Sequence, residues 1–321
     1  MLYLNDRDIG AAGLDWTALV DCLESAVHIL DSGDFAQPVK PYLRYNNPHN
    51  RIIAMPAYVG GDVDAAGIKW IASFPDNPAA GLPRAHSIIV LNDPMTGQPS
   101  AVLNSAIPSI VRTASISGLM LRHYQQARPR KQIHLGIIGW GPIGQYHVQM
   151  AAALYGELIE RIILFDIKGA DLSKVPPLYR DRTQAAKTWE EVYLQSNVFI
   201  TCTVSADRYI DLPPLPGSLL LNVSLRDYLP EALASVKAVI VDDWDEVCRE
   251  NTDIERLHLE RGLNRTDAML LTDVVCRSCL TRISAGEPVF FSPMGMAVFD
   301  IATAMYYVKA ARNKGIGTEL E

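Results

Sequence analysis

The spacing of apolar positions divides the chain into two parts. Near the N-terminus, residues 14–32 carry apolar side chains at helical spacing, and Asp15 can cap the helix. Another helix is predicted over 105–124. Between the two helices the chain contains strand-like runs bounded by turn-rich segments, at 40–45, 51–56, 66–73, 86–92 and 100–104. These elements predict an α+β module that contains a meander of strands.

After residue 132 the pattern changes to alternating strands and helices. A strand at 133–138, a helix at 143–155 and a strand at 162–166 come first. Further elements are predicted at 183–195 (a weaker strand and helix), 198–204, 219–223 and 238–241. This alternation is typical of a doubly wound α/β fold with a parallel sheet. The last segment, 297–313, is predicted to form an amphipathic helix that packs on the first module.

A glycine motif follows the first strand of this second part. The sequence there reads GWGPIG, with Gly139, Gly141 and Gly144, and the next apolar run ends on Asp166. Gly139 permits a tight turn, Gly141 lets the backbone approach a pyrophosphate, and Gly144 lets the helix lie close to the strand. The helix N-terminus offers free N–H groups to phosphates, and Asp166 can accept hydrogen bonds from ribose hydroxyls. The motif predicts binding of a dinucleotide. Asp166 favours NAD over NADP, which carries a 2′-phosphate, although the positive charge of Lys168 could accommodate that phosphate.

Composition and charge exclude several function classes. The chain has 321 residues, 49% of them hydrophobic, and a formal net charge of −7 with a pI near 5.5. These values are typical of a globular protein with two domains, and they argue against a nucleic-acid partner. The only basic cluster, RPRK at 128–131, is interpreted as a solvated linker.

The N-terminus resembles no signal peptide, and no apolar run approaches the roughly 20 residues that span a bilayer. We therefore expect no membrane association. The odd number of cysteines, five, favours reduced thiols and a cytoplasmic location. Cys276 and Cys279 form a CxxC, but no second pair completes a zinc site, so no metal is expected.

Residues that follow buried parallel strands are candidates for chemistry, because ligands bind outside the carboxyl ends of such strands. Thr203 and Val204 follow one strand, and Ser224 and Asp227 follow another. Asp227 can take a proton or steady a substrate ammonium group. Position alone equally allows a loop aspartate that caps its own backbone.

The N-terminal module offers three cations in apolar sequence surroundings, Arg44, Lys69 and Arg112. Lys69 lies between Ile68 and Trp70, so burial is expected to lower its pKa, which suits proton transfer. The arginines can bind carboxylates through bidentate hydrogen bonds. The alternative for each arginine is an ion pair on the surface. The alternative for Lys69 is a position on an edge strand with its side chain facing solvent.

Several motifs, in this order, resemble those of the ornithine cyclodeaminase/mu-crystallin family over essentially the whole chain. They are RIIAMPAY, GIKW, DNP, SIVRTASIS, GWGPIG, NVSLRD and SPMGMAVFD. The resemblance implies a substrate-binding and dimerisation domain, 1–125 plus 297–321, that is interrupted by an NAD-binding Rossmann domain, 126–296. It also implies a homodimer and a small amino-acid substrate.

The resemblance assigns roles to individual positions. Lys69 and Asp227 are the implied catalytic residues. The implied substrate-binding residues are Arg44, Met55, Lys69 and Arg112. Together with the glycine motif and the strand ends, the resemblance gives the cofactor-binding set Arg112, Thr113, Gly139, Gly141, Pro142, Ile143, Gly144, Asp166, Thr203, Val204, Ser224, Met294 and Gly295.

Within the family, further motifs resemble dehydrogenases that oxidise N-(2-amino-2-carboxyethyl)-L-glutamate and supply 2,3-diaminopropionate for antibiotics or siderophores of the staphyloferrin B type. These motifs are KPYLR, NRIIAMP, GIKWI, ITCTV, VDDW and GIGT. The cyclodeaminases carry a glycine-rich stretch before the catalytic aspartate, whereas this chain has Leu225 and Arg226, which favours a more acidic substrate than ornithine. Two kinds of alternative remain. One is another reaction of the family, namely ornithine cyclodeamination, imine reduction or alanine dehydrogenation. The other is a non-catalytic nucleotide-binding role.

Overall fold

The computed structural model describes all 321 residues, and they form two compact units. Unit 1 contains Met1–Arg112 and Met296–Glu321, and unit 2 contains Thr113–Gly295. The first division lies inside helix α3 (Ile107–Ala127), whereas the sequence predicted a boundary after residue 125. A continuous helix gives no sequence signal of such a division, because its propensities and spacing do not change there.

Unit 1 is built on an eight-stranded sheet in the order β16-β1-β7-β6-β5-β4-β2, with β3 also paired to β4. Neighbouring strands are antiparallel except β1 and β7. The strands are β1 (Leu2–Asn5), β2 (Phe35–Ala36), β3 (Tyr42–Leu43), β4 (Arg51–Val59), β5 (Ala65–Ser73), β6 (Ala85–Asn92), β7 (Pro99–Asn104) and β16 (Thr318–Glu319), and the helices within this unit are α1 (Asp6–Ala12), α2 (Trp16–Ser32) and α9 (Ala297–Lys314). The predicted strand meander is confirmed, but β1, β2, α1 and β16 were not foreseen.

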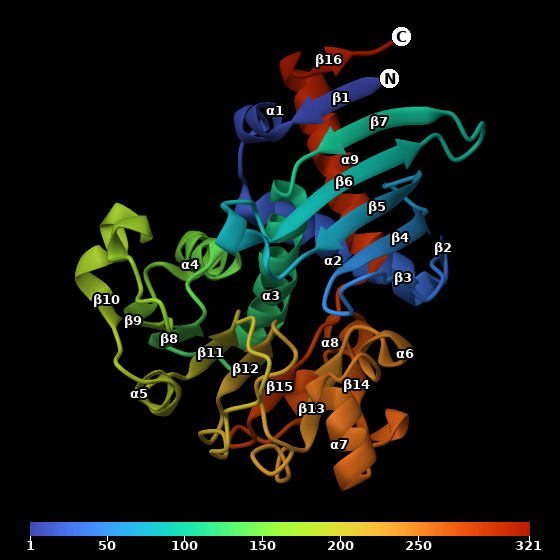
Figure 1. Cartoon of the computed structure of the whole chain (residues 1–321). Coiled ribbons are helices and arrows are strands. Elements are labelled where there is room, and N and C mark those ends of the chain that lie inside the picture. Colours follow the sequence, from blue (N-terminus) through green and yellow to red (C-terminus); the bar gives the residue numbers. More distant parts are fainter. The chain divides into compact units, whose positions relative to one another are not determined.

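Helix α2 begins and ends where the sequence predicts. The side chain of Asp15 accepts a hydrogen bond from the backbone N–H of Ala18 at 3.0 Å, and Gly33 ends the helix in the left-handed conformation. Helix α9 runs across β4, β5 and β6 and also contacts α2 (Figure 1). Its first two turns, 297–304, are buried on every side, so the predicted helix is confirmed but its predicted amphipathic character is wrong there. The reason is that sheet and helices cover both of its faces.

Unit 2 contains an eight-stranded, all-parallel sheet in the order β10-β9-β8-β11-β12-β15-β13-β14. Its strands are β8 (Ile133–Ile138), β9 (Ile159–Phe165), β10 (Thr183–Ala185), β11 (Val198–Thr201), β12 (Leu219–Asn222), β13 (Ala238–Val241), β14 (Met269–Leu270) and β15 (Val289–Phe291), and its helices are α4 (Pro142–Tyr155), α5 (Trp189–Leu194), α6 (Trp244–Val247), α7 (Asp253–Arg261) and α8 (Leu271–Arg277). The predicted α/β class with a doubly wound parallel sheet is confirmed. The strand order reverses between β8 and β11: β9 and β10 follow on one side, and β11 and β12 follow on the other. Dinucleotides bind at this point in such folds.

Two arginines of the RPRK segment form structural hydrogen bonds inside unit 2. Arg128 donates to the carbonyl oxygens of Glu287 and Ser284, both at 2.7 Å, and Arg130 donates to the Tyr124 hydroxyl and the Gly217 carbonyl. The interpretation of this segment as a solvated linker is therefore wrong for these two side chains.

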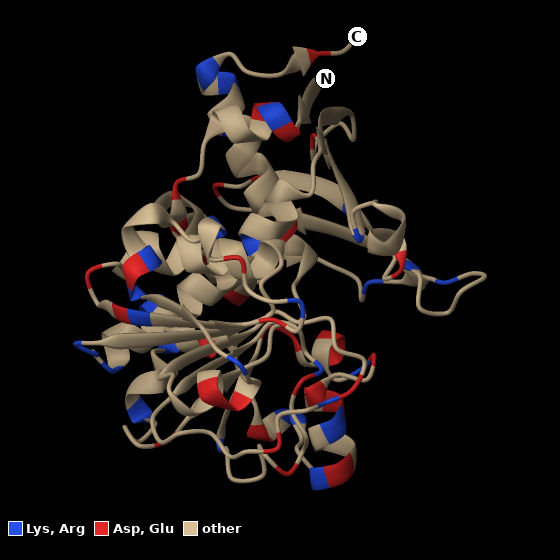
Figure 2. Cartoon of the chain, turned by 60° about the vertical axis from the view of Figure 1, so that its left-hand side comes forward, with Lys and Arg blue, Asp and Glu red and all other residues tan.

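Charged residues of both signs are spread along the chain, while the strands of the unit 1 sheet are mostly uncharged (Figure 2). None of the helices has the length and hydropathy that crossing a membrane requires.

Candidate functional site

The glycine motif forms the turn between β8 and α4. Gly139 has φ +93°, and a Cβ atom there would overlap the carbonyl oxygen of Cys202. A Cβ atom on Gly144 would overlap the carbonyl oxygen of Gly139, so the helix lies against the turn. Gly141, by contrast, has open space around its Cβ position and stands at the N-cap of α4. Two glycines thus shape the turn, and the third leaves free the space that a pyrophosphate requires.

Asp166 follows β9 and is tied to the same turn. Its carboxylate accepts hydrogen bonds from the backbone N–H groups of Trp140 and Lys168, both at 2.8 Å. Each carboxylate oxygen keeps a further lone pair that can accept from a ribose hydroxyl. Pro142 and Ile143 open the first turn of α4, where N–H groups remain free for an anion. These residues fit the adenosine and pyrophosphate parts of a dinucleotide.

Asp227 is fully buried beyond the end of β12 in unit 2. Its two carboxylate oxygens accept short hydrogen bonds from the hydroxyl groups of Thr203 and Ser224. The structure therefore brings together three of the predicted strand-end residues around one carboxylate, whereas Val204 is 66% exposed. The two hydroxyl donors fix the orientation of the Asp227 carboxylate.

Tyr209 lies next to Asp227, and its backbone N–H donates to the Asp227 carbonyl oxygen at 3.0 Å. Burial raises the pKa of Tyr209 well above its ordinary value, and the negative charge of Asp227 raises it further. Burial and the same charge raise the pKa of the Cys202 thiol. Both neighbours of Asp227 therefore stay protonated at neutral pH.

The turn that contains Met294 and Gly295 is held by a buried acid of unit 2. Asp242, which follows β13, accepts hydrogen bonds from the backbone N–H groups of Met294 at 2.9 Å and Gly295 at 2.7 Å. Thr113 is half-buried on α3. The cofactor contacts expected of these three residues stay predictions.

Unit 1 contains a second cluster, formed by Lys69, Arg112 and Asp300. The Nζ atom of Lys69 on β5 lies 2.7 Å from Oδ2 of Asp300, and the Nε atom of Arg112 lies 2.8 Å from Oδ1. The Lys69 ammonium also donates to the Ser109 hydroxyl at 3.4 Å. Asp300, in the first turn of α9, therefore joins two buried cations.

Burial lowers the pKa of Lys69 from 10.5 to about 7; Asp300 opposes this shift, and the charges of Arg112 and Lys40 add to it. For Asp300, burial favours a higher pKa, but the charges of Arg112 and Lys69 hold it below 3.8. Lys69 can thus exchange a proton near neutral pH. The cluster carries an excess of positive charge that suits an anionic ligand.

The other two predicted substrate-binding residues occupy different surroundings. Met55 lies directly opposite Lys69 in the β4–β5 pairing and is buried, so the two side chains share one face of the sheet. Arg44, which follows β3, is exposed, and its guanidinium group lies over the Tyr42 ring at 5.0 Å. The expectation that Arg44 lies in apolar surroundings is wrong, because β3 has only two residues and the chain after it is on the surface.

Sequence reasoning missed two buried charged residues of unit 1. Asp300 is 1% exposed and Lys40 is 4% exposed. Asp300 had a signal, an acid in the otherwise apolar stretch AVFDIATA, since a carboxylate in such a stretch requires a partner. Lys40 stands beside Pro41 at the edge of a turn-rich segment and had none.

The five cysteines are free, and no group of three or more His, Cys, Asp and Glu side chains is arranged to hold a metal ion.

Comparison with known proteins adds to this geometry. The model of the ornithine cyclodeaminase/mu-crystallin family matches residues 7–315. The chain is 35% identical to the N-((2S)-2-amino-2-carboxyethyl)-L-glutamate dehydrogenase of Staphylococcus aureus, over 100% of this chain and 98% of that protein.

Two solved structures share the fold. The Δ1-pyrroline-2-carboxylate reductase of Thermococcus litoralis, in complex with NADH and L-proline, has a TM-score of 0.84 and 22% identity and covers both chains completely. An archaeal alanine dehydrogenase dimer with bound NAD has a TM-score of 0.78 and 21% identity, over 100% of this chain and 99% of that chain.

Proposed function

The chain belongs to the ornithine cyclodeaminase/mu-crystallin family and resembles NAD-dependent oxidoreductases, and we propose that it oxidises N-(2-amino-2-carboxyethyl)-L-glutamate with NAD. The observation that carries the proposal is the buried cationic cluster of unit 1, in a chain 35% identical to a dehydrogenase of that substrate. The substrate has three carboxylates. Lys69 and Arg112, with Lys40 nearby, supply positive charge that one buried acid, Asp300, neutralises only in part.

The atoms of the reaction balance as follows. The Cα–H bond of the glutamate part breaks as hydride leaves, the amine nitrogen loses a proton, and a C=N bond forms. Water adds to this carbon and the C–N bond breaks. The products are 2-oxoglutarate, 2,3-diaminopropionate, NADH and one proton. Bound NAD supplies the hydride acceptor.

The chain's own residues bind, orient and move protons. Arg112, with Arg44 and Met55, is proposed to hold the substrate, because a guanidinium group fixes a carboxylate by two hydrogen bonds. Lys69 and Asp227 are the two proposed bases, one for the amine proton and one for the water. The pKa of Lys69, about 7, allows it to accept a proton at neutral pH.

The glycine turn, the first turn of α4 and Asp166 are proposed to hold NAD. The open space at Gly141 supports this, since a close backbone approach to the pyrophosphate needs it. The Asp166 carboxylate disfavours a 2′-phosphate by charge repulsion. Thr113, Thr203, Val204, Ser224, Met294 and Gly295 complete the proposed cofactor contacts.

The test is to incubate purified protein with NAD and the amino-acid conjugate. Formation of NADH, with 2-oxoglutarate and 2,3-diaminopropionate in equal amounts, supports the proposal, and absence of NADH refutes it. Lys69→Ala and Asp227→Asn are expected to lose most activity. If both variants act like the wild type, the chain's role is not the proposed one.

A second candidate within the family is a cyclodeaminase or an NAD(P)H-dependent imine reductase or alanine dehydrogenase. The named activities of the solved structures that share the fold favour this candidate. Ammonia release from ornithine without net NADH, or reduction of a cyclic imine or of pyruvate with ammonia, would support it. Binding of NAD without any of these reactions would instead support a non-catalytic role.

We also propose that the protein is a homodimer. The unit 1 sheet carries α9 on one face, and its other face presents apolar residues, among them Trp70, which is 42% exposed. Ala54 and Ile88 stand directly opposite Trp70 on the neighbouring strands. A second copy that covers this face would remove this apolar surface from water. The archaeal alanine dehydrogenase, which shares the fold, is described as a dimer.

A further inference from the structure

The turn that precedes Asp227 contains a strained residue. Leu225 has φ +71°, in the left-handed region that favours glycine. Its side chain is only 8% exposed and packs in the apolar core of unit 2. A leucine in this conformation lowers the folding equilibrium constant by about tenfold, because its Cβ atom crowds the carbonyl group. Surrounding contacts must therefore hold the turn.

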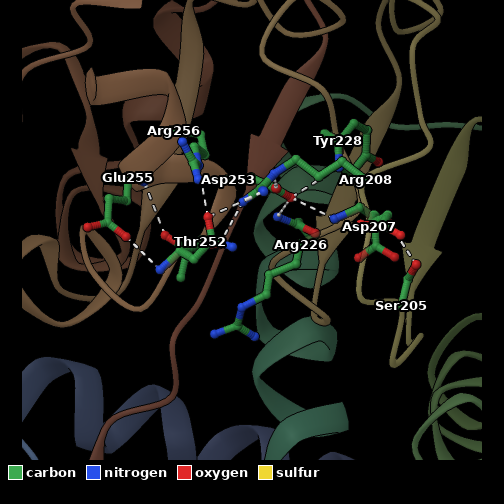
Figure 3. A network of polar contacts seen from close by, with 12 residues as sticks. Ser205, Asp207, Arg208, Arg226, Tyr228, Thr252, Asp253, Glu255 and Arg256 are labelled. Carbon is green, nitrogen blue, oxygen red and sulfur yellow. Dashed lines mark hydrogen bonds and ion pairs between the residues drawn. The ribbon is translucent and has the colours of Figure 1, made fainter. Parts of the chain in front are cut away.

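Asp253, the first residue of α7, supplies these contacts. It is 1% exposed. Its backbone N–H donates to the Leu225 carbonyl oxygen at 2.8 Å. Its carboxylate oxygen Oδ2 accepts from the backbone N–H groups of Asp227 at 3.1 Å and Tyr228 at 3.3 Å. Asp253 thus binds the carbonyl group of the strained residue and the N–H groups of residues 227 and 228 after it; Asp253 and Tyr228 are labelled in Figure 3.

The same carboxylate is fixed from two other directions. Its Oδ2 accepts from the Asn222 amide at the end of β12 at 3.0 Å, and its Oδ1 accepts from Nε of Arg208 at 2.7 Å. Arg208 also donates to the carbonyl oxygen of Asn251 at 2.6 Å, which ties it to the segment before α7 (Figure 3). Asp253 therefore has little freedom to follow a movement of the turn.

We propose that Asp253 is a positioning residue whose backbone and carboxylate hold residues 225–228 in the strained turn that places Asp227 against Thr203 and Ser224. The claim that this affects catalysis rests on the proposed function of Asp227. The claim about the turn itself can be tested without turnover.

The first experiment compares Asp253→Asn with the wild type by hydrogen exchange and by kinetics. The variant keeps the shape of the side chain but presents an amide to Arg208, so the 225–228 contacts loosen. We expect faster amide exchange in 222–230 and a kcat about 100-fold lower at nearly unchanged KM, since small misplacement of a reacting group has an effect of this order. The control is Glu255→Gln, in the same turn of α7. The Glu255 carboxylate accepts a hydrogen bond from the Asn251 N–H at 2.6 Å, and the substitution should change neither quantity. Arg208→Lys is a milder second variant and should show the same pattern if Asp253→Asn does not fold.

The second experiment separates strain from packing at Leu225. Leu225→Gly and Leu225→Ala remove the same core contacts, but only glycine relieves the left-handed strain. We expect Asp253→Asn to reduce the folding equilibrium constant in both backgrounds. The factor of this reduction should be about tenfold smaller in the Leu225→Gly background than in the Leu225→Ala background. We also expect only glycine to restore part of the lost kcat. Equal effects in both backgrounds, or unchanged exchange in 222–230, overturn the proposal. Absence of NADH formation by the wild type refutes the proposed function, while exchange and stability still decide whether Asp253 holds the turn.

Discussion

Replacing Asp300 by asparagine tests the electrostatic account of the unit 1 cluster. The substitution keeps the size of the side chain but removes the charge that faces Lys69 at 2.7 Å and Arg112 at 2.8 Å. Arg112, and Lys69 wherever it is protonated, then stay buried without a counter-charge. Loss of one partner from a buried ion pair typically costs about 3–5 kcal/mol, so we expect a decrease of this order in the free energy of unfolding.

The cost should also depend on pH. The pKa of Lys69 is about 7 in the folded protein and 10.5 as its ordinary value, so Lys69 is protonated and paired with Asp300 below neutral pH. Without Asp300, the Lys69 pKa falls further. The folded variant then binds fewer protons than the folded wild type in the range just below pH 7, and its stability rises more steeply with pH. The destabilisation should therefore be larger near pH ~6 than near pH ~9, where only the Arg112 interaction is lost.

The assay is urea unfolding at these two pH values, followed by circular dichroism. The control is Glu260→Gln, which removes an acid from an exposed ion pair with Arg256 at 3.2 Å and should cost only about 0–1 kcal/mol. If Asp300→Asn costs no more than the control, or costs more at the higher pH, the reasoning about this cluster is refuted.

Three further predictions follow from the geometry. If neutral Lys69 accepts the substrate proton, kcat/KM for oxidation should fall about tenfold per pH unit below about pH 7 and level off above it. Lys69→Arg should abolish this inflection. An unchanged pH profile in that variant would assign the titration to another group. Gly139→Ala should lower the melting temperature strongly, because Gly139 has a φ of +93°. Gly141→Ala should leave the melting temperature unchanged and weaken NAD binding measured by calorimetry. A larger loss of melting temperature in Gly141→Ala than in Gly139→Ala would contradict these roles. Trp70→Glu should convert a dimer to a monomer in light scattering, whereas Leu259→Glu, at a site 66% exposed on α7, should not. A wild-type monomer at all concentrations would refute the dimer.

Patterns that depend on local chemistry could be predicted from the sequence. The family and the α/β class are confirmed, because glycine spacing, strand–helix alternation and motif order are written in short segments. The lowered pKa of Lys69 was also foreseen, since a lysine between Ile68 and Trp70 on a strand is readily buried.

Features that depend on tertiary contacts could not be predicted. Asp300 is 231 positions away from Lys69 in the chain, so nothing local indicated their pairing. Arg44 was expected in a strand at 40–45, yet β3 has only two residues and ends before it. The burial of the first two turns of α9 on all sides likewise arises from α2 and the sheet, which pack around them. The positive φ of Leu225 lies in a turn that Asp253, 28 positions later, is proposed to hold.

The most direct test of the proposed reaction is to follow the hydrogen that leaves the substrate. The conjugate is prepared with deuterium at Cα of its glutamate part and oxidised by the protein with NAD. We predict one deuterium atom in the NADH formed and none in the 2-oxoglutarate. NADH without deuterium, or no NADH at all, would contradict hydride transfer from this carbon.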